Sequence, residues 1–472
     1  MTPPAGSPGP TEPPAGRGRT SSVTRRNALV GIGAAGIAAT VLLFGGILSG
    51  SKTVDPIRAA IAAAGPAAAK QDALTRLVAG LSTGDTAGYV RKLERHVAAH
   101  PHDADALTLL GLSYQQRARE TGDPTYYKLS GEALQRAANA GGQRPLIVQG
   151  QAALANTRHR FQDGLRLARL AISLAPDNAS AYGALGDALV NLGRYRAGFK
   201  AYDRMTLLAP GIASYTRVAS ARELLGRRGA AAEADKLALQ TGDSIVPEHV
   251  AWTMVQLGNV RFNTGRLDQA EAAYRRALAR LPGYVHAEAG LARVEASEGR
   301  YRIAIKRLRR AVQVLPVPAY VIMLGDVLHA SGDDKAARRE YALVRAIERL
   351  FAANGVRTEL QTALFDLDHR HNVSDALARA RIAYASAPGI YAEDALAWGL
   401  FRTGRCEAAR SHSAHALRLG TRDALLVFHR AMIERCLGSP SARSWFRRAL
   451  ALNPHFSFLW APVARKALRA GP

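Results

Sequence analysis

Prolines recur along this chain at a fixed interval. Pro176 and Pro210 are separated by about 34 residues, and Pro282 and Pro316 are separated by the same interval. The intervals from Pro210 to Pro282 and from Pro316 to Pro388 equal each other and slightly exceed two such periods. A period of this length is typical of stacked helical units, each of which buries its apolar surface only against its neighbours. The sequence therefore predicts a repeat array instead of a single globular core.

The residues inside each period predict two helices, A and B, joined by a tight turn. In the unit that ends at Pro282, Leu257 and Gly258 lie in helix A, Gly265 lies in the turn, and Tyr274 lies in helix B. We expect the small side chains to let the two helices approach closely, while Leu257 and Tyr274 fill the space between units. Two further units repeat the pattern, with Leu185, Gly186, Gly193 and Tyr202 in one and Leu324, Gly325, Ala337 and Tyr341 in the other.

This pattern resembles that of the tetratricopeptide-repeat family. The shared features are the period, the Leu-Gly pair, the small and aromatic positions and the closing proline. The resemblance implies an all-α fold, a right-handed superhelix of about ten helix-turn-helix repeats over residues 70–454 with a capping helix at 455–470. The interval from Pro101 to Pro176 exceeds two periods by several residues, which predicts an extended turn at residues 117–124. A composition that is 48% hydrophobic but only 6% aromatic suits closely packed helices.

The N-terminal region predicts a membrane anchor. Residues 1–27 are rich in Pro, Gly, Ser and Thr and are expected to be a disordered cytoplasmic tail, while residues 49–69 are expected to be a linker with a short helix. Residues 28–48 contain no charge and are long enough for one transmembrane helix or uncleaved signal anchor. Four arginines precede this run, so the positive-inside rule places the N-terminus in the cytoplasm and the array outside. A cleaved export signal is the alternative, because Arg25 and Arg26 resemble a twin-arginine signal, and it leads to the same location.

The formal net charge of +25 favours an anionic partner. Nucleic acid is not expected, because the arginines are spread over nearly every predicted helix and do not form a stripe interleaved with aromatic residues. An anionic lipid or cell-surface polymer is an alternative partner.

Motifs for catalysis are missing from the sequence, which contains no G-x-S-x-G, P-loop, H-E-x-x-H or C-x-x-C pattern. We therefore expect a protein that is not an enzyme and that has no cofactor. His96 and His100 share one helix face beside His102, which leaves metal handling as a further alternative, but a solvated helix end explains these histidines equally well.

Cys406 and Cys436 are the only cysteines. They fall at the start of helix B in one repeat and at the end of helix A in the next, where an antiparallel arrangement brings helix ends together. A disulfide between them is therefore possible in an oxidising compartment, and two reduced cysteines are the other possibility.

The expected function is protein binding through the face formed by the A helices. The family resemblance implies a partner-binding groove lined by Asp187, Asn191, Trp252, Asn259, Phe262, Asn263 and Arg293. A second candidate surface is a basic face made of Arg300, Arg302, Lys306, Arg307, Arg309 and Arg310. We therefore expect a membrane-anchored scaffold for exported or membrane proteins, and the alternative is a basic adaptor for anionic lipid or polymer.

Overall fold

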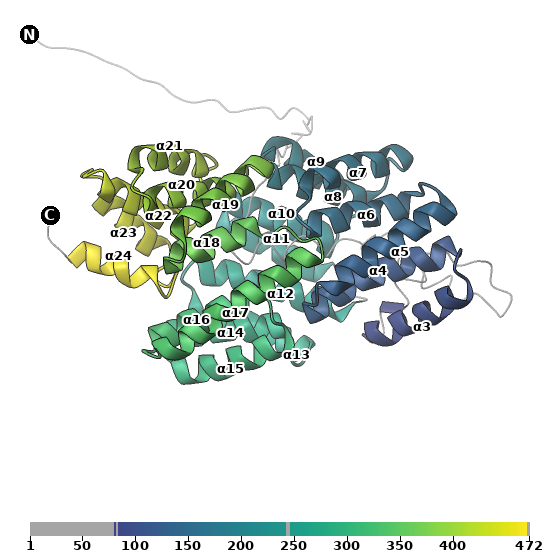
Figure 1. Cartoon of the computed structure of the whole chain (residues 1–472), viewed down its shortest axis with the longest axis horizontal. Helices are drawn as coiled ribbons and strands as arrows, with labels where there is room; N and C mark the ends of the chain where they lie inside the picture. The colour runs from purple at the N-terminus through teal and green to yellow at the C-terminus, as the bar shows by residue number, and fades with distance from the viewer. Residues whose placement is uncertain (1–79, 82–83, 242–245, 470–472) are drawn as a thin grey trace, which may run out of the picture. The chain divides into compact units, whose positions relative to one another are not determined.

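The computed structural model describes residues 80–81, 84–241 and 246–469, which belong to one compact unit, Gly31–Pro472 (Figure 1). These residues form 22 α-helices and no strand, so the all-α prediction is confirmed. None of the described helices is long and apolar enough to cross a membrane. The predicted tail at 1–27, the apolar segment at 28–48 and the linker at 49–69 lie outside the described residues.

Ten helical hairpins follow one leading helix and precede one final helix. The leading helix is α3 (Thr86–Ala99) and the final helix is α24 (Trp460–Arg469). The first member of each hairpin is called its A helix and the second its B helix. In chain order the hairpins are α4 (Ala104–Thr121) with α5 (Thr125–Gly141), α6 (Pro145–Thr157) with α7 (Phe161–Leu174), α8 (Ala179–Asn191) with α9 (Tyr195–Leu208), α10 (Ile212–Leu224) with α11 (Arg228–Gln240), α12 (Pro247–Asn263) with α13 (Leu267–Arg280), α14 (Val285–Ser297) with α15 (Tyr301–Val314), α16 (Pro318–Ala330) with α17 (Asp334–Ala353), α18 (Glu359–His369) with α19 (Val373–Ser386), α20 (Ile390–Arg402) with α21 (Cys406–Ala416), and α22 (Ala424–Cys436) with α23 (Ala442–Leu452).

Glycines on the A helices provide the space in which the B-helix tyrosines pack. The buried ring of Tyr274 lies between Gly258 of its own A helix and Gly290 of the next one. A Cβ atom added at Gly258 would lie 2.5 Å from the ring, and one added at Gly290 would lie 2.6 Å from it. Any larger residue at either position would therefore push the helices apart, which explains the Leu-Gly pair and the tyrosine seen in the sequence.

The predicted extended turn at residues 117–124 is wrong. Helix α4 continues to Thr121 and ends at Gly122, which adopts the left-handed conformation with φ 67°. The last turn of α4 is stabilised by Arg117, whose Nη1 donates to Oε2 of Glu120 at 2.8 Å. The extra residues therefore lengthen the two helices of this hairpin and do not widen the turn.

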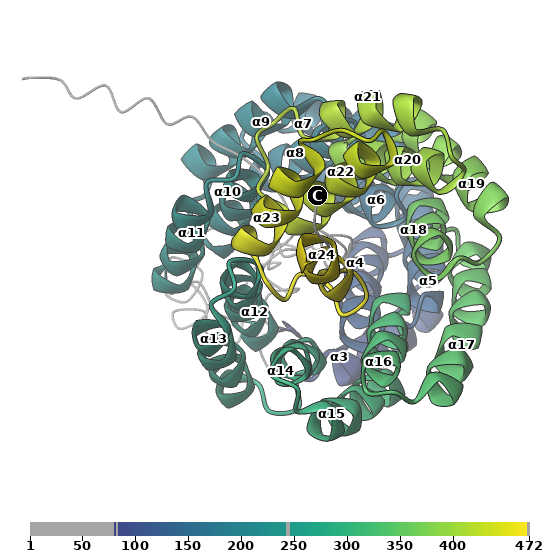
Figure 2. The same ribbon diagram turned by 90° about the vertical axis from the view of Figure 1, so that its left-hand side faces the viewer.

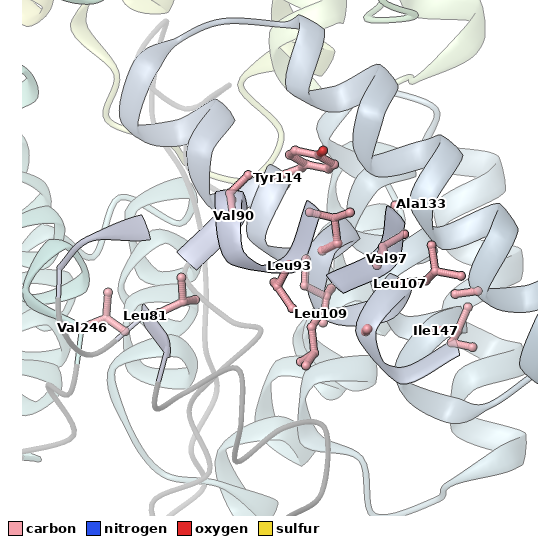
Figure 3. Close-up of a cluster of buried hydrophobic side chains, with 14 residues drawn as sticks. Leu81, Val90, Leu93, Val97, Leu107, Leu109, Tyr114, Ala133, Ile147 and Val246 are labelled. Atoms are coloured by element: carbon pink, nitrogen blue, oxygen red, sulfur yellow. The ribbon is translucent and has the colours of Figure 1, made fainter. Parts of the chain in front are cut away.

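Buried aliphatic side chains fill the space between neighbouring helices (Figure 3). In the first cluster, Leu93 of α3 packs with Leu107 and Leu109 of α4 and with Ile147 of α6. The same cluster includes Val246, which directly precedes α12. In Figure 3, Val246 lies beside Leu81, so the described residues before α3 approach a segment from much later in the chain.

Successive turns of the superhelix contact one another at regular intervals. Nδ1 of His159, in the turn between α6 and α7, lies 2.6 Å from the carbonyl oxygen of Arg357, just before α18. The hydroxyl of Tyr195, at the start of α9, accepts a hydrogen bond from the backbone N–H of Ile390 at 2.7 Å. Arg228, at the start of α11, donates to the carbonyl oxygen of Leu452 at 3.2 Å. Each contact joins hairpins six positions apart, so one superhelical turn contains about six hairpins (Figure 2).

Candidate functional site

The A helices line the inside of the superhelix and the B helices lie outside (Figure 2). Consecutive A helices contact each other along most of the array, whereas the described B helices make no contacts of comparable extent with the next B helix. This arrangement allows polar residues on the A helices either to bind a partner or to connect one hairpin to the next. The side-chain contacts decide between these two roles.

Asp187 of α8 connects two hairpins. Its carboxylate accepts hydrogen bonds from Nε and Nη2 of Arg217 on α10, at 2.9 and 2.7 Å. The hydroxyl of Tyr202 on α9 donates to the same carboxylate at 2.9 Å. Asp187 is 1% exposed and Arg217 is 8% exposed, so both charges are removed from solvent. The structure therefore does not place Asp187 on a partner-binding surface.

Asn259 of α12 makes the equivalent connection in a later part of the array. Oδ1 of Asn259 accepts hydrogen bonds from the hydroxyl of Tyr274 and from Nη2 of Arg293, both at 2.8 Å. The guanidinium of Arg293 also lies over the ring of Phe262, 3.9 Å from its centroid. Phe262 itself is 3% exposed and belongs to the core. These residues hold α12, α13 and α14 together.

Asp326 of α16 makes the third connection of this kind. It accepts from the hydroxyl of Tyr341 on α17 at 2.8 Å and lies 2.9 Å from Nε2 of His369 on α18. We call each set a polar rung, which consists of an acceptor directly after a Leu-Gly pair, a tyrosine on the following B helix and a donor from the next A helix. The acceptor and the tyrosine are 15 residues apart in all three rungs. This constant spacing is visible in the sequence and is the signal that could have identified the rungs there.

The two other predicted asparagines are also engaged within the array. Nδ2 of Asn191 donates to the backbone carbonyl of Asp187 at 2.8 Å, and Nδ2 of Asn263 donates to Glu223 at 3.3 Å. Asn191 bonds within its own helix, so among the seven predicted groove residues Asn191 and Trp252 are the two that are partly exposed and make no hydrogen bond to another hairpin within the described part of the chain.

Trp252 belongs to an aromatic patch, defined here as Trp252, Tyr284, His286 and Tyr320. The rings of Trp252 and His286 meet edge to face with centroids 5.1 Å apart, and Nδ1 of His286 lies 2.5 Å from the hydroxyl of Tyr320. The hydroxyl of Tyr284 donates to Glu248 at 2.7 Å. The patch is contributed by the N-terminal halves of α12, α14 and α16 and by the residue before α14. Three of its four side chains are half-buried, so each of the three keeps part of its surface accessible to solvent.

The ionisable groups around the patch have strongly shifted pKa values. Burial lowers the pKa of His249 to about 4 and the pKa of His286 to about 4, so both imidazoles are neutral near pH 7. Burial alone would raise the pKa of Glu248, but the nearby Arg119 guanidinium holds that pKa below its ordinary value. The patch therefore presents neutral rings beside a largely buried carboxylate, a surface suited to apolar or aromatic side chains of a partner.

These two histidines predict a loss of stability in mild acid. In the unfolded chain a histidine has a pKa of about 6.5, so between about pH 6.5 and 4 the unfolded state takes up protons that the folded state does not. Stability is therefore expected to fall as the pH drops through this window, and the loss is complete below about pH 4. In thermal denaturation, the melting temperature should decrease less between about pH 6.5 and 4 for His249→Gln than for the wild type. His102→Gln, which changes an exposed histidine, serves as the control, and an unchanged slope in His249→Gln would contradict the assignment.

The predicted basic face is divided by the structure. Arg307 of α15 points toward α14, where its Nη2 donates to Glu295 at 2.9 Å and its Nη1 pairs with Glu288. These carboxylates raise the pKa of Arg307, whose charge is therefore neutralised within the array. Arg300 precedes the helix and pairs with Glu298. The remaining four cations, namely Arg302, Lys306, Arg309 and Arg310, are exposed on the outer side.

Cys406 and Cys436 are joined by a disulfide, with their Cα atoms 6.2 Å apart. Cys406 is the first residue of α21 and Cys436 is the last residue of α22, as the antiparallel arrangement predicts. The bridge ties together the two hairpins nearest the C-terminal end.

Removal of this disulfide is expected to lower the free energy of unfolding by about 2–4 kcal/mol, because the bridge restricts the unfolded chain. The measurement is urea denaturation of the Cys406→Ala/Cys436→Ala variant beside the oxidised wild type. Wild type treated with reductant should match the variant. A variant as stable as the oxidised protein would show that the bridge contributes nothing.

The histidines near the start of the array are engaged with their own neighbours. Nε2 of His96 lies 2.9 Å from Asp103, and the rings of His96 and His100 are stacked with centroids 4.5 Å apart. Within the described ranges, no group of three or more His, Cys, Asp or Glu side chains has an arrangement that could hold a metal ion.

The hairpins, the rungs and the continuous A-helix surface define an α-helical repeat solenoid, a class of protein that works by presenting surfaces to partners. The profile of the tetratricopeptide repeat family matches residues 253–280, which cover one hairpin, α12 and α13, except for its first turns. This match supports the predicted resemblance to the tetratricopeptide-repeat family.

Several solved structures resemble the chain. One chain in the crystal structure of the APC/C hetero-tetramer Cut9-Hcn1 has 12% sequence identity over 82% of this chain and 94% of its own length, with a TM-score of 0.32. A tetratricopeptide repeat protein from Parabacteroides merdae has 14% identity over 51% of this chain and 98% of its own, with a TM-score of 0.37. YrrB, described as a TPR protein with an unusual peptide-binding site, has 18% identity, coverage of 42% and 98%, and a TM-score of 0.28. No curated protein matches the sequence significantly.

Proposed function

We propose that this protein is a non-catalytic, membrane-anchored scaffold that binds an exported or membrane protein through the aromatic patch. The observation that carries the proposal is the division of labour among the A-helix residues. Asp187, Asn259, Phe262 and Arg293 are used to join hairpins, whereas Trp252, His286 and Tyr320 on the A helices remain partly exposed. Partly exposed aromatic side chains next to polar groups are the residues that most often dominate binding energy at protein interfaces.

Two observations support a location outside the cytoplasm. The uncharged run at residues 28–48 has the length of a membrane span, and the arginines before it favour a cytoplasmic N-terminus. The Cys406–Cys436 disulfide is of a kind that persists in oxidising compartments. Together they support a repeat array that faces proteins which have crossed the membrane.

Site-specific photo-crosslinking tests the binding role. A photoreactive residue is introduced in place of Trp252 or, as the matched control, in place of the half-buried Trp445 on the outer helix α23. The full chain in its native membranes should give a defined crosslinked product from position 252 and none from position 445. The same product should weaken at least about tenfold when Tyr320 is also changed to alanine, because a central contact would be lost. Equal products from both positions would reject the patch as the binding site.

Membrane attachment has a separate test. If residues 28–48 are retained as an anchor, the full-length chain resists extraction with alkaline carbonate, and protease added from outside digests the array. Release of a shortened chain into the soluble fraction would support the cleaved-signal alternative. Digestion only after the membrane is opened would reject the proposed topology.

A further inference from the structure

The outer helices α15 and α17 carry an unusual number of free cations. Eight exposed side chains on these two helices have no ion-pair or hydrogen-bond partner among the described residues: Arg302, Lys306, Arg309 and Arg310 on α15, and Lys335, Arg338, Arg339 and Arg349 on α17. Helix α15 contains no acidic residue at all. On α17, Asp334 is exposed and lies 2.6 Å from His329, and Glu340 is half-buried, so the eight cations outnumber these acids. This surface is therefore strongly positive.

The spacing on α15 concentrates the charges. Arg302, Lys306 and Arg310 follow one another at intervals of four residues, which places them along one side of the helix. Like charges at this spacing repel one another and destabilise an isolated helix. An anionic partner on this side would convert the repulsion into attraction.

Aliphatic side chains are exposed among these cations. Val314 is 60% exposed and Ile303 is 48% exposed on α15, while Leu343 and Leu350 are each 48% exposed on α17. Cations interspersed with exposed aliphatic side chains are typical of helices that lie in the interface of a lipid bilayer, where the charges meet headgroups and the aliphatic groups enter the apolar boundary. A soluble polyanion would leave these aliphatic groups in water.

Aromatic side chains are not exposed on either helix, since Tyr301, Tyr341 and Phe351 are all buried or half-buried. Single-stranded nucleic acid is usually held by exposed aromatic rings on which the bases stack. The composition of the surface therefore favours lipid over nucleic acid.

We propose that the outer face of α15 and α17 docks on a bilayer that contains anionic lipid. The face would hold the repeat array against the membrane surface while the A helices stay turned toward the inside of the superhelix. The docking is independent of the aromatic patch, so either proposal can fail without the other.

The experiment measures contact with lipid at the α15–α17 face directly. Binding of the full-length chain to vesicles would not be informative, because the segment at 28–48 would attach the chain to any vesicle. A fluorophore sensitive to its environment is attached through Ile303→Cys in the full chain, which is reconstituted in vesicles of phosphatidylcholine alone or with phosphatidylglycerol. The matched control label is at Leu237→Cys on the outer helix α11, where the exposed side chain is next to the paired Lys236 and Glu233. Quenching by a spin-labelled headgroup reports contact with the bilayer.

We expect quenching at position 303 only with phosphatidylglycerol, and none at position 237 with either vesicle. Replacing Arg302, Lys306, Arg309 and Arg310 by glutamine should reduce this quenching at least about tenfold, since each cation near an anionic surface adds to the attraction. Equal quenching in neutral vesicles, or at both labels, would overturn the proposal. The proposal would also be overturned if soluble polyphosphate changed the fluorescence at position 303 as strongly as anionic vesicles do.

Discussion

Replacement of Asp187 by alanine is expected to lower the free energy of unfolding by about 3–5 kcal/mol, because it leaves a buried cation without its partner. Arg217 is 8% exposed and donates two hydrogen bonds to the Asp187 carboxylate in the native protein. The hydroxyl of Tyr202 loses its acceptor at the same time. Urea denaturation followed by circular dichroism measures the change.

The matched control removes the whole rung. In the triple variant Asp187→Leu/Arg217→Met/Tyr202→Phe no polar group of the rung is left unpaired, and most of the wild-type stability should be retained, because apolar groups of similar size often replace a buried ion pair without loss. If Asp187→Ala alone lowered the free energy of unfolding by less than about 1 kcal/mol, the rung would not be a major stabilising contact between these hairpins. Hydrogen exchange should place the loss in α8 to α10, the helices that the rung joins.

Replacement of Trp398 by alanine is expected to cost about 3–5 kcal/mol as well, through a different mechanism. The Trp398 side chain is fully buried in α20, where its ring stacks on His429 at 4.1 Å and on Phe401 at 4.8 Å between centroids. Its Nε1 donates to Asp368 of α18 at 3.0 Å. The truncation creates a cavity at the junction of three hairpins and removes one of the two indole donors to that carboxylate.

Trp445 provides the matched control for this prediction. It is half-buried on the outer helix α23 and contacts the guanidinium groups of Arg430 and Arg448, 5.5 and 5.1 Å from its ring centroid. Its replacement by alanine removes only partly exposed surface and weak cation–π contacts, so a cost of about 1 kcal/mol is expected. If both substitutions lowered the free energy of unfolding equally, the burial of Trp398 in α20 would not explain its contribution to stability.

The hairpins could be predicted because their determinants are close together in the sequence. Gly258 and Tyr274 belong to one repeat, and their packing sets the distance between α12 and α13. The same holds for Gly325 and Tyr341 in α16 and α17. Local spacing also predicted the position of Cys436 opposite Cys406, since both lie at helix ends of adjacent hairpins.

The role of the polar A-helix residues could be predicted only in part. Asn259 and Trp252 lie on the same helix and are both partly exposed, yet Asn259 accepts hydrogen bonds from Tyr274 and Arg293 whereas Trp252 has only ring contacts. The difference depends on which side chain of the next hairpin reaches each position. Arg307 was misjudged for a different reason, because Glu288 and Glu295 on the A helix of its own hairpin pair with it.

The sequence by itself determined the all-α class, the hairpin unit and its register, because a period of about 34 residues and a glycine opposite a tyrosine act over distances no longer than one repeat. Only the tertiary structure decided how the turns of the superhelix meet. Tyr195 bonds to the backbone of Ile390 across 195 residues, and Arg228 reaches Leu452 across 224. Such contacts depend on small rotations between hairpins that accumulate over about six repeats, and no local pattern in the sequence records that sum.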